Sequence, residues 1–392
     1  MRKSLALIGL ACFASVSVLI LNGCKGQQGP VGPKGDSTVV SLTGFAQGIV
    51  CANCHNPDTD TTYYVWAKEY QWQLSKHAIG GDFDRNQTPC SGCHTTEGYV
   101  QRMLAGNPPE ANWTGIVTSQ VDASPPGCFA CHSPHTNGDF RRRTVSPVSM
   151  ISPMNGVANQ TIDLGNGNTC LSCHQPRSMS PLMPQTAAAT DSILITNNRW
   201  YPHYGVQGLM YKGAGAGGGF EYAGSTYSNS PHPSQTIIQQ QGCPTCHMAD
   251  ATAGSGIAGG HTMNIHYTNT SGALAWLTNG CTQAGCHTSM PSVDSYVSVS
   301  ASLTGGMGVR TFVVNNLDTL KLLLVKKAYL DTTTDAIGIP LASTSKPLHI
   351  PVTKAGALYN YLFISHDLSN GIHNSKYAIQ LLIDSIAEMK KP

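Results

Sequence analysis

Cysteine and histidine are the residues of this 392-residue chain whose spacing points most directly to chemistry. Ten of the 14 cysteines form five Cys-x-x-Cys-His motifs, and two more form a sixth motif with four residues between the cysteines. In chain order, motifs one to six comprise Cys51, Cys54 and His55; Cys90, Cys93 and His94; Cys128, Cys131 and His132; Cys170, Cys173 and His174; Cys243, Cys246 and His247; and Cys281, Cys286 and His287.

A Cys-x-x-Cys-His motif is typical of covalent attachment of a c-type haem. The short spacer lets both thiols add to the vinyl groups at one porphyrin edge, and the following histidine turns back to bind the iron. Zinc and dithiol sites do not explain a histidine directly after every cysteine pair. We therefore predict six covalently attached c-type haems, with the motif cysteines as attachment points and the motif histidines as proximal iron ligands.

The ligand on the far side of each iron decides between an electron carrier and a catalyst. A second histidine fills that position, whereas an open position admits a substrate. Nine histidines lie outside the motifs, which is enough for six irons. Ligation of every iron by two histidines is therefore possible.

Sequence context selects among these histidines. His135 follows His132 by three residues, a tether too short for the far face of the same haem, so we expect it to bind the iron of a neighbouring haem. His77 follows an aromatic segment that we predict to be a helix, residues 63–74, and is also predicted as a distal ligand. One residue of His261 and His266 should be a ligand, and we favour His261.

The long interval between motifs four and five contains His203 and His232. Both are predicted as distal ligands, with positions in surface loops as the alternative. A glycine-rich segment in the same interval, residues 213–219, is expected to be a surface loop. His349 and His366 are interpreted as structural histidines.

Composition limits the elements that can hold these motifs. Charged residues are 11% and aromatic residues 7% of the chain, while it contains 41 glycines and 23 prolines. Such a chain is too apolar to be disordered and too rich in breakers for a large sheet. We expect a mainly α fold with extensive loops, organised around six haems. Helices are predicted at residues 316–330, 352–364 and 374–389, the last with a packed face of Tyr377, Ala378, Leu381, Leu382 and Ser385.

The N-terminus predicts export. Residues 1–23 combine a basic start with an apolar stretch, as in a signal peptide. Leu21-Asn22-Gly23-Cys24 resembles a bacterial lipobox with Cys24 as the acylated residue, and a soluble secreted protein or an uncleaved anchor are the alternatives. Residues 24–44, which carry Gly-X-Y triplets, are predicted to be a lipidated tether rather than a trimerisation seed. Residues 45–290 are then the hexahaem domain, and residues 291–392 a helical region without haem motifs that packs on it.

Three segments resemble exported multihaem c-type cytochromes of the superfamily that holds the tetrahaem cytochromes of ammonia oxidisers and the ammonia-forming nitrite reductases. Ser75-Lys-His77-Ala resembles a distal-ligand segment there, and Cys246-His247-Met248 with the later Gly260-His261-Thr-Met resembles another. The segment from Gly371 to Leu382 resembles the C-terminal His-Asn-Pro-x-Tyr-Ala helix start, and this implies that His373 is a distal ligand, although Ser375 replaces the usual proline. In type, the chain looks most like the surface cytochromes of metal-reducing bacteria.

These features predict electron transfer by an exported cytochrome, on the outer membrane or cell surface, in respiration or extracellular electron transfer. A periplasmic or secreted location is the alternative. Other redox proteins and extracellular acceptors are the expected partners, nucleic acid is not, and catalysis is not expected. One alternative function is a haem reductase of nitrite, hydroxylamine or a sulfur oxyanion, with Arg141, Arg142 and Arg143 attracting the anion. The other is a filament built through stacked terminal haems.

Overall fold

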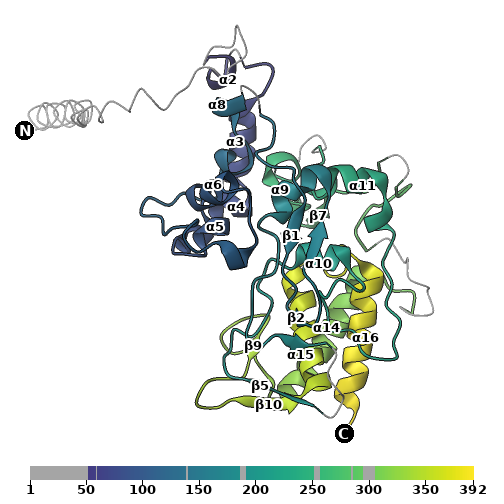
Figure 1. Cartoon of the computed structure of the whole chain (residues 1–392). Helices are drawn as coiled ribbons and strands as arrows, with labels where there is room; N and C mark the ends of the chain where they lie inside the picture. Colours follow the sequence, from purple (N-terminus) through teal and green to yellow (C-terminus); the bar gives the residue numbers. More distant parts are fainter. Residues whose placement is uncertain are drawn as a thin grey trace, which may run out of the picture.

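The computed structural model describes residues 52–58, 60–137, 140–185, 191–250, 257–283, 286–294 and 305–392. Cys24, Cys51 and the predicted signal peptide and tether lie outside these residues. Short helices that carry the motifs form one end of the described molecule, and three long C-terminal helices form the other (Figure 1).

Most helices are one or two turns long, because turns and motif spacers interrupt them. The short α-helices are α2 (Ala52–His55), α3 (Val65–Gln73), α4 (Lys76–Ile79), α5 (Ser91–His94), α6 (Thr96–Leu104), α7 (Cys128–Cys131), α8 (Pro134–Asn137), α9 (Asn168–Leu171), α10 (Gln207–Lys212), α11 (Thr236–Gln241) and α12 (Pro244–His247). The 3-10 helices are η2 (Asp82–Asp84), η3 (Glu110–Asn112), η4 (Gly165–Gly167), η5 (His232–Ser234) and η6 (Gly260–Thr262). The long helices are α14 (Val309–Lys326), α15 (Val352–Asp367) and α16 (Ser375–Lys390).

All sheets within the described residues are two-stranded. β1 (Val148–Met150) pairs with β3 (Gln160–Ile162), β2 (Met154–Asn155) with β4 (Met183–Pro184), β5 (Ser192–Ile195) with β10 (Leu348–Pro351), β6 (His266–Thr268) with β7 (Leu274–Trp276), and β8 (Leu330–Asp331) with β9 (Ile339–Pro340). Only the β2–β4 pair is parallel. The sequence predicted no strands and a mainly α fold. The described residues instead form a mixture of helices and short strands.

The predicted helices are found, with one shifted boundary. The segment predicted at 63–74 is α3, and those predicted at 352–364 and 374–389 are α15 and α16. The helix predicted at 316–330 instead runs from Val309 to Lys326. It starts earlier because Phe312 and Val313 extend its buried face. It ends earlier because Ala328 has a positive φ of 57° and turns the chain into β8.

The packed face predicted for α16 is confirmed. Tyr377, Ala378, Leu381, Leu382 and Ser385 all have 0% exposure. This helix packs against both α14 and α15, which lie beside it in the view of Figure 1. Periodicity was a reliable guide here because one face of an amphipathic helix must be buried.

The prediction of a surface loop at residues 213–219 is wrong. Most of this glycine-rich segment is buried against α15 and α16. Tyr359 donates its hydroxyl to the Gly218 carbonyl at 2.8 Å, and the Gly219 amide donates to the Tyr377 hydroxyl at 3.1 Å. A Cβ on Gly219 would lie 2.5 Å from Leu381, so the glycines are needed for close approach of backbone to helix.

One hydrophobic core joins the centre of the chain to its C-terminal helices. Its buried members all come from residues 148–220 and 309–389. Hydrogen bonds reinforce the junction, since the Asn360 side chain accepts from the Phe220 amide at 2.7 Å and donates to the Phe220 carbonyl at 2.9 Å. The C-terminal helices are therefore part of the scaffold that positions the central motifs.

Candidate haem-binding sites

Each motif histidine faces one of the six predicted distal histidines. The ring centroids are 6.1 Å apart for His55 and His135, 6.2 Å for His174 and His77, 6.2 Å for His94 and His203, 6.3 Å for His132 and His261, 6.2 Å for His287 and His232, and 6.2 Å for His247 and His373. No histidine is shared between two pairs. The structure thus brings all twelve predicted histidines together two by two.

This separation is the one that an iron ion between two imidazoles requires. A metal–nitrogen bond of about 2 Å on each side, plus the ring radius on each side, puts the centroids roughly 6 Å apart. A direct N–H···N hydrogen bond would bring them about 1 Å closer. The paired residues therefore fit a haem iron with two axial histidines. Within the described residues there is no group of three or more His, Cys, Asp or Glu side chains suited to a bare metal ion.

The pairs connect parts of the chain that are far apart in sequence. His135, beside motif three, faces His55 of motif one, and this agrees with the argument that its tether is too short for its own haem. His77, which precedes motif two, faces His174 of motif four. His261, which follows motif five, faces a histidine of motif three. The sequence predicted which histidines take part, but not which pairs they form.

Hydrogen bonds at Nδ1 fix the orientation of several motif histidines. The His174 Nδ1 atom lies 3.1 Å from Gln207 Oε1, and the His247 Nδ1 atom lies 3.0 Å from the Met263 carbonyl oxygen. A ring that donates from Nδ1 presents its unprotonated Nε2 to a metal. Gln207 and Met263 were not predicted as site residues, because their roles depend on tertiary contacts and not on a motif.

Asp367 has a similar role at a distal histidine. Its Oδ1 atom lies 2.7 Å from His373 Nδ1, and its side chain is 0% exposed. Burial lowers the pKa of His373, but the Asp367 carboxylate outweighs burial and leaves that pKa above its ordinary value. Asp367 is the last residue of α15, six residues before His373, and no spacing rule predicts its role.

Burial favours the neutral form of three other paired imidazoles. Desolvation lowers the pKa of His203 to about 3, and it lowers the pKa values of His247 and His261 to about 4. A neutral imidazole is the form that binds iron, because a protonated ring has no free lone pair. The surroundings of these rings therefore favour metal ligation at neutral pH.

Cysteines of different motifs lie against one another. Interacting pairs are Cys93 with Cys173, Cys170 with Cys243, and Cys246 with Cys281. Cys131 of motif three lies near Cys170 of motif four. Burial first, and then the charge of the nearby Cys170, raise the pKa of Cys131 to about 12. Motif four thus lies against motifs two and five, motif five lies against motif six, and motif three lies near motif four.

Arginines support the motifs from within the protein. Arg143, which was considered as part of an anion site, donates to the carbonyls of Phe129 and His132 at 2.6–3.0 Å and so braces motif three. Arg102 is 0% exposed and donates to Cys93 Sγ at 3.1 Å. It also donates to the Ser172 carbonyl, which links motif two to motif four.

The remaining histidines have other surroundings. His266 is exposed and packs edge-on against Trp276 with centroids 5.4 Å apart. His366 is buried between Tyr201 and Tyr204, with centroids 5.0 and 4.4 Å away. His349 is an exposed residue of β10. These positions agree with the structural roles assigned to His349 and His366.

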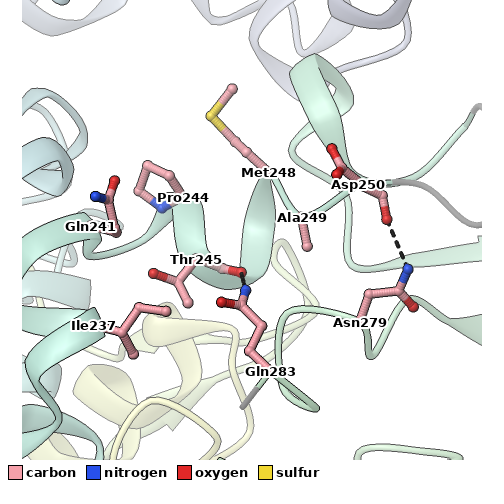
Figure 2. A pocket seen from close by; sticks show the side chains of 9 residues that line it. All are labelled: Ile237, Gln241, Pro244, Thr245, Met248, Ala249, Asp250, Asn279 and Gln283. Carbon is pink, nitrogen blue, oxygen red and sulfur yellow. Dashed lines mark hydrogen bonds between the residues drawn. The ribbon is translucent and has the colours of Figure 1, made fainter.

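A cavity of about 540 Å³ lies beside α12, and Figure 2 shows the residues that line it. It is lined by spacer residues of motifs five and six, including Thr245 and Gln283, and the Gln283 amide donates to the Thr245 carbonyl at 3.3 Å. No cysteine or histidine lines it.

Comparison with known proteins supports a multihaem c-type cytochrome. The chain is 23% identical over 412 aligned residues to the C-type polyheme cytochrome OmcB from two strains of Geobacter sulfurreducens, covering 89% of this chain and 48% of the relative. The chain thus spans about half the length of the curated relatives it matches. The crystal structure of the outer cell wall cytochrome OcwA matches with a TM-score of 0.44 and 16% identity, over 82% of this chain and 50% of that one. No family model matches the chain.

None of the helices in the described ranges has the length and apolar character needed to cross a bilayer.

Proposed function

We propose that this chain is an exported hexahaem c-type cytochrome that carries electrons along haems ligated by two histidines each. The observation that carries the proposal is the set of six histidine pairs, all with ring centroids 6.1–6.3 Å apart. Each pair joins one motif histidine, the proximal ligand, to one histidine from elsewhere, the distal ligand. The twelve motif cysteines attach the haems, Cys51 being one that lies outside the described residues.

The haems supply one-electron chemistry when bound, and the chain determines where and at what potential it occurs. The motif histidines and their partners would hold the irons from both sides and would so exclude substrates from them. The Gln207 side-chain oxygen accepts from Nδ1 of His174, and the Met263 carbonyl accepts from Nδ1 of His247. These hydrogen bonds fix the orientation of the two rings. Ligation by two histidines favours low potentials.

Contacts between motif cysteines support a spatial order for the haems. Each attached sulfur marks a porphyrin edge, so neighbouring sulfurs imply neighbouring edges. The contacts described above give a path from motif six through motif five to motif four, where it divides toward motifs two and three. Motif one continues from motif three, because His135 bridges to His55 and packs on Phe129 at 5.3 Å.

The carrier function is favoured over the reductase alternative. A reductase needs an open axial position, and the six pairs provide two histidines for each of six irons. Arg143 faces carbonyls of motif three rather than a substrate space. The large cavity beside α12 has no histidine in its lining.

Export and anchoring are part of the proposal and depend on residues 1–24. We propose cleavage before Cys24, acylation of its thiol, and a place on the outer membrane or cell surface. Other redox proteins, periplasmic or outer-membrane cytochromes, and extracellular acceptors are the proposed partners. The similarity to OmcB supports the cytochrome part of this proposal.

Haem quantitation combined with low-temperature electron paramagnetic resonance of the full mature chain tests the function. We expect six haems per chain, all low-spin in the ferric state, and no carbon monoxide bound after reduction. One equivalent of carbon monoxide or a high-spin haem signal would contradict ligation by two histidines at that site. Turnover of nitrite or hydroxylamine would favour the reductase instead.

A further inference from the structure

One distal histidine, His373, has a charged hydrogen-bond partner. The structure gives ring-nitrogen partners for five of the paired histidines. Four of these partners are neutral: the Gln207 amide, the carbonyls of Met263 and Arg141, and the Met263 sulfur. The fifth is the Asp367 carboxylate on His373, at 2.7 Å. His373 faces His247 of motif five, so the distal histidine of this site has a negative charge beside it.

The position of Asp367 is fixed on several sides. Its side chain is fully buried, and the Ser369 hydroxyl donates to its second oxygen. The Gln207 amide, whose oxygen faces His174, lies 3.4 Å from the Asp367 carbonyl. The Ser369 hydroxyl also accepts from the His373 amide at 3.2 Å. The carboxylate is thus held in line with Nδ1 and does not swing to solvent.

A carboxylate in this position changes the electronic character of the ligand. It draws the Nδ1 proton toward itself, which makes the imidazole a stronger donor to the iron. The buried negative charge also stabilises the ferric state more than the ferrous state, because that state carries one more positive charge. Both effects lower the potential of the iron at motif five.

Motifs two and four have the opposite kind of charge. The Arg102 guanidinium lies between them, fully buried, with the Trp113 and Tyr99 rings 4.6 and 5.0 Å from its central carbon. The guanidinium donates to Cys93 Sγ and to the Ser172 carbonyl, neither of which is a carboxylate. A buried cation beside these attachment points favours the reduced state of the adjacent irons.

We propose that Asp367 and Arg102 tune the reduction potentials of neighbouring haems. Asp367 lowers the potential of the motif-five haem, and Arg102 raises the potentials of the motif-two and motif-four haems, so the motif-five haem has the lower potential. The inference rests on the proposed function, because it assumes that His373 and His247 bind the same iron. An electron then passes downhill when ferrous iron at motif five is oxidised and ferric iron at motif four is reduced. Electrons from motif six must cross the low-potential motif-five haem before they reach the branch at motif four.

The first test is a potentiometric titration of the full-length holoprotein and its Asp367→Asn variant, followed by absorbance and electron paramagnetic resonance. Asparagine keeps an oxygen for Nδ1 and removes the charge. We expect one of the six reduction potentials to rise by at least 59 mV, which corresponds to a tenfold change in a one-electron redox equilibrium constant. One low-spin signal should also shift. Asp384→Asn is the matched control, because Asp384 accepts from the Tyr227 hydroxyl and should leave every potential unchanged.

Unchanged potentials in an Asp367→Asn protein that keeps six low-spin haems would overturn the inference and leave the proposed function intact. A high-spin haem signal from the wild-type protein would instead overturn the proposed function. The second test compares Arg102→Gln with Arg102→Lys. The glutamine variant should lower at least one potential and the lysine variant should restore it; equal potentials in both folded variants would remove Arg102 from the proposal.

Discussion

His135 faces His55 with ring centroids 6.1 Å apart, although it follows the motif-three histidine His132 by only three residues. One short segment therefore serves two haem sites, with His132 in one pair and His135 in the other. Any movement of this segment changes the separation and orientation of both sites together. Motifs one and three are thus mechanically coupled.

Replacement of His135 tests its assignment as the distal ligand opposite His55. We expect His135→Ala to leave one iron without its distal ligand, so that one of six haems becomes high-spin and binds one equivalent of carbon monoxide when reduced. The measurement is carbon monoxide titration of the purified protein. His266→Ala is the control, because His266 is exposed against Trp276, and it should bind none. No carbon monoxide binding by the His135 variant would refute the assignment.

Gly356 in α15 predicts an unusual effect of alanine. Alanine in a helix interior is ordinarily more stable than glycine by about 1 kcal/mol. Here a Cβ would lie 2.2 Å from the buried Phe220 ring. We expect Gly356→Ala to destabilise the protein by about 1–3 kcal/mol through overpacking, measured by chemical denaturation. Addition of Phe220→Leu should recover part of the loss, and a stabilised single variant would contradict the packing.

Two buried threonines provide a matched pair. The Thr95 hydroxyl caps α6 by accepting from the Gly98 amide at 3.0 Å, whereas no described residue hydrogen-bonds the buried Thr245 hydroxyl beside the cavity of Figure 2. We expect Thr95→Val to cost about 1 kcal/mol and Thr245→Val to be neutral or stabilising. Denaturation midpoints compare them. An equal loss in both variants would mean that the Thr245 hydroxyl has a partner in solution.

The lipid anchor is predicted from sequence and tested by fractionation. We expect Cys24→Ser to move the protein from the membrane fraction to the soluble fraction, because the acyl chains provide stable attachment. Haem content should not change, since Cys24 belongs to no motif. Intact-mass measurement of the wild-type protein should show the diacylglycerol and acyl additions. Membrane association of the serine variant would point to another anchor.

Sequence reasoning was strongest where a chemical rule restricts residue choice. The motifs themselves select cysteine and histidine, and the helical repeat of α16 selects its buried face. The distal histidines could be named from local context, yet their partners could not, because pairing such as His77 with His174 depends on tertiary structure. Whether each pair binds a haem stays a prediction.

Features that depend on backbone packing or on a single tertiary contact could not be predicted from the sequence. The glycine-rich segment at 213–219 has the composition of a loop, but its small residues let the backbone approach α15 and α16. Asp367 and Arg102 have ordinary sequence neighbours, and only burial and distance reveal them. The short strands escaped prediction because two or three residues give no usable periodicity.

The main hydrophobic core begins at Val148, so residues 52–137 contribute none of its buried members. Three histidine pairs, His77 with His174, His94 with His203 and His132 with His261, connect that first segment to later parts of the chain. Each bound haem would then link residues that are far apart in sequence and so reduce the entropy of the unfolded haem-bound chain. Haem attachment should therefore also stabilise the fold. Without haem, the N-terminal segment keeps hydrogen bonds such as that from Arg102 to the Ser172 carbonyl but loses three ligand pairs, so it should be the first region that a protease removes.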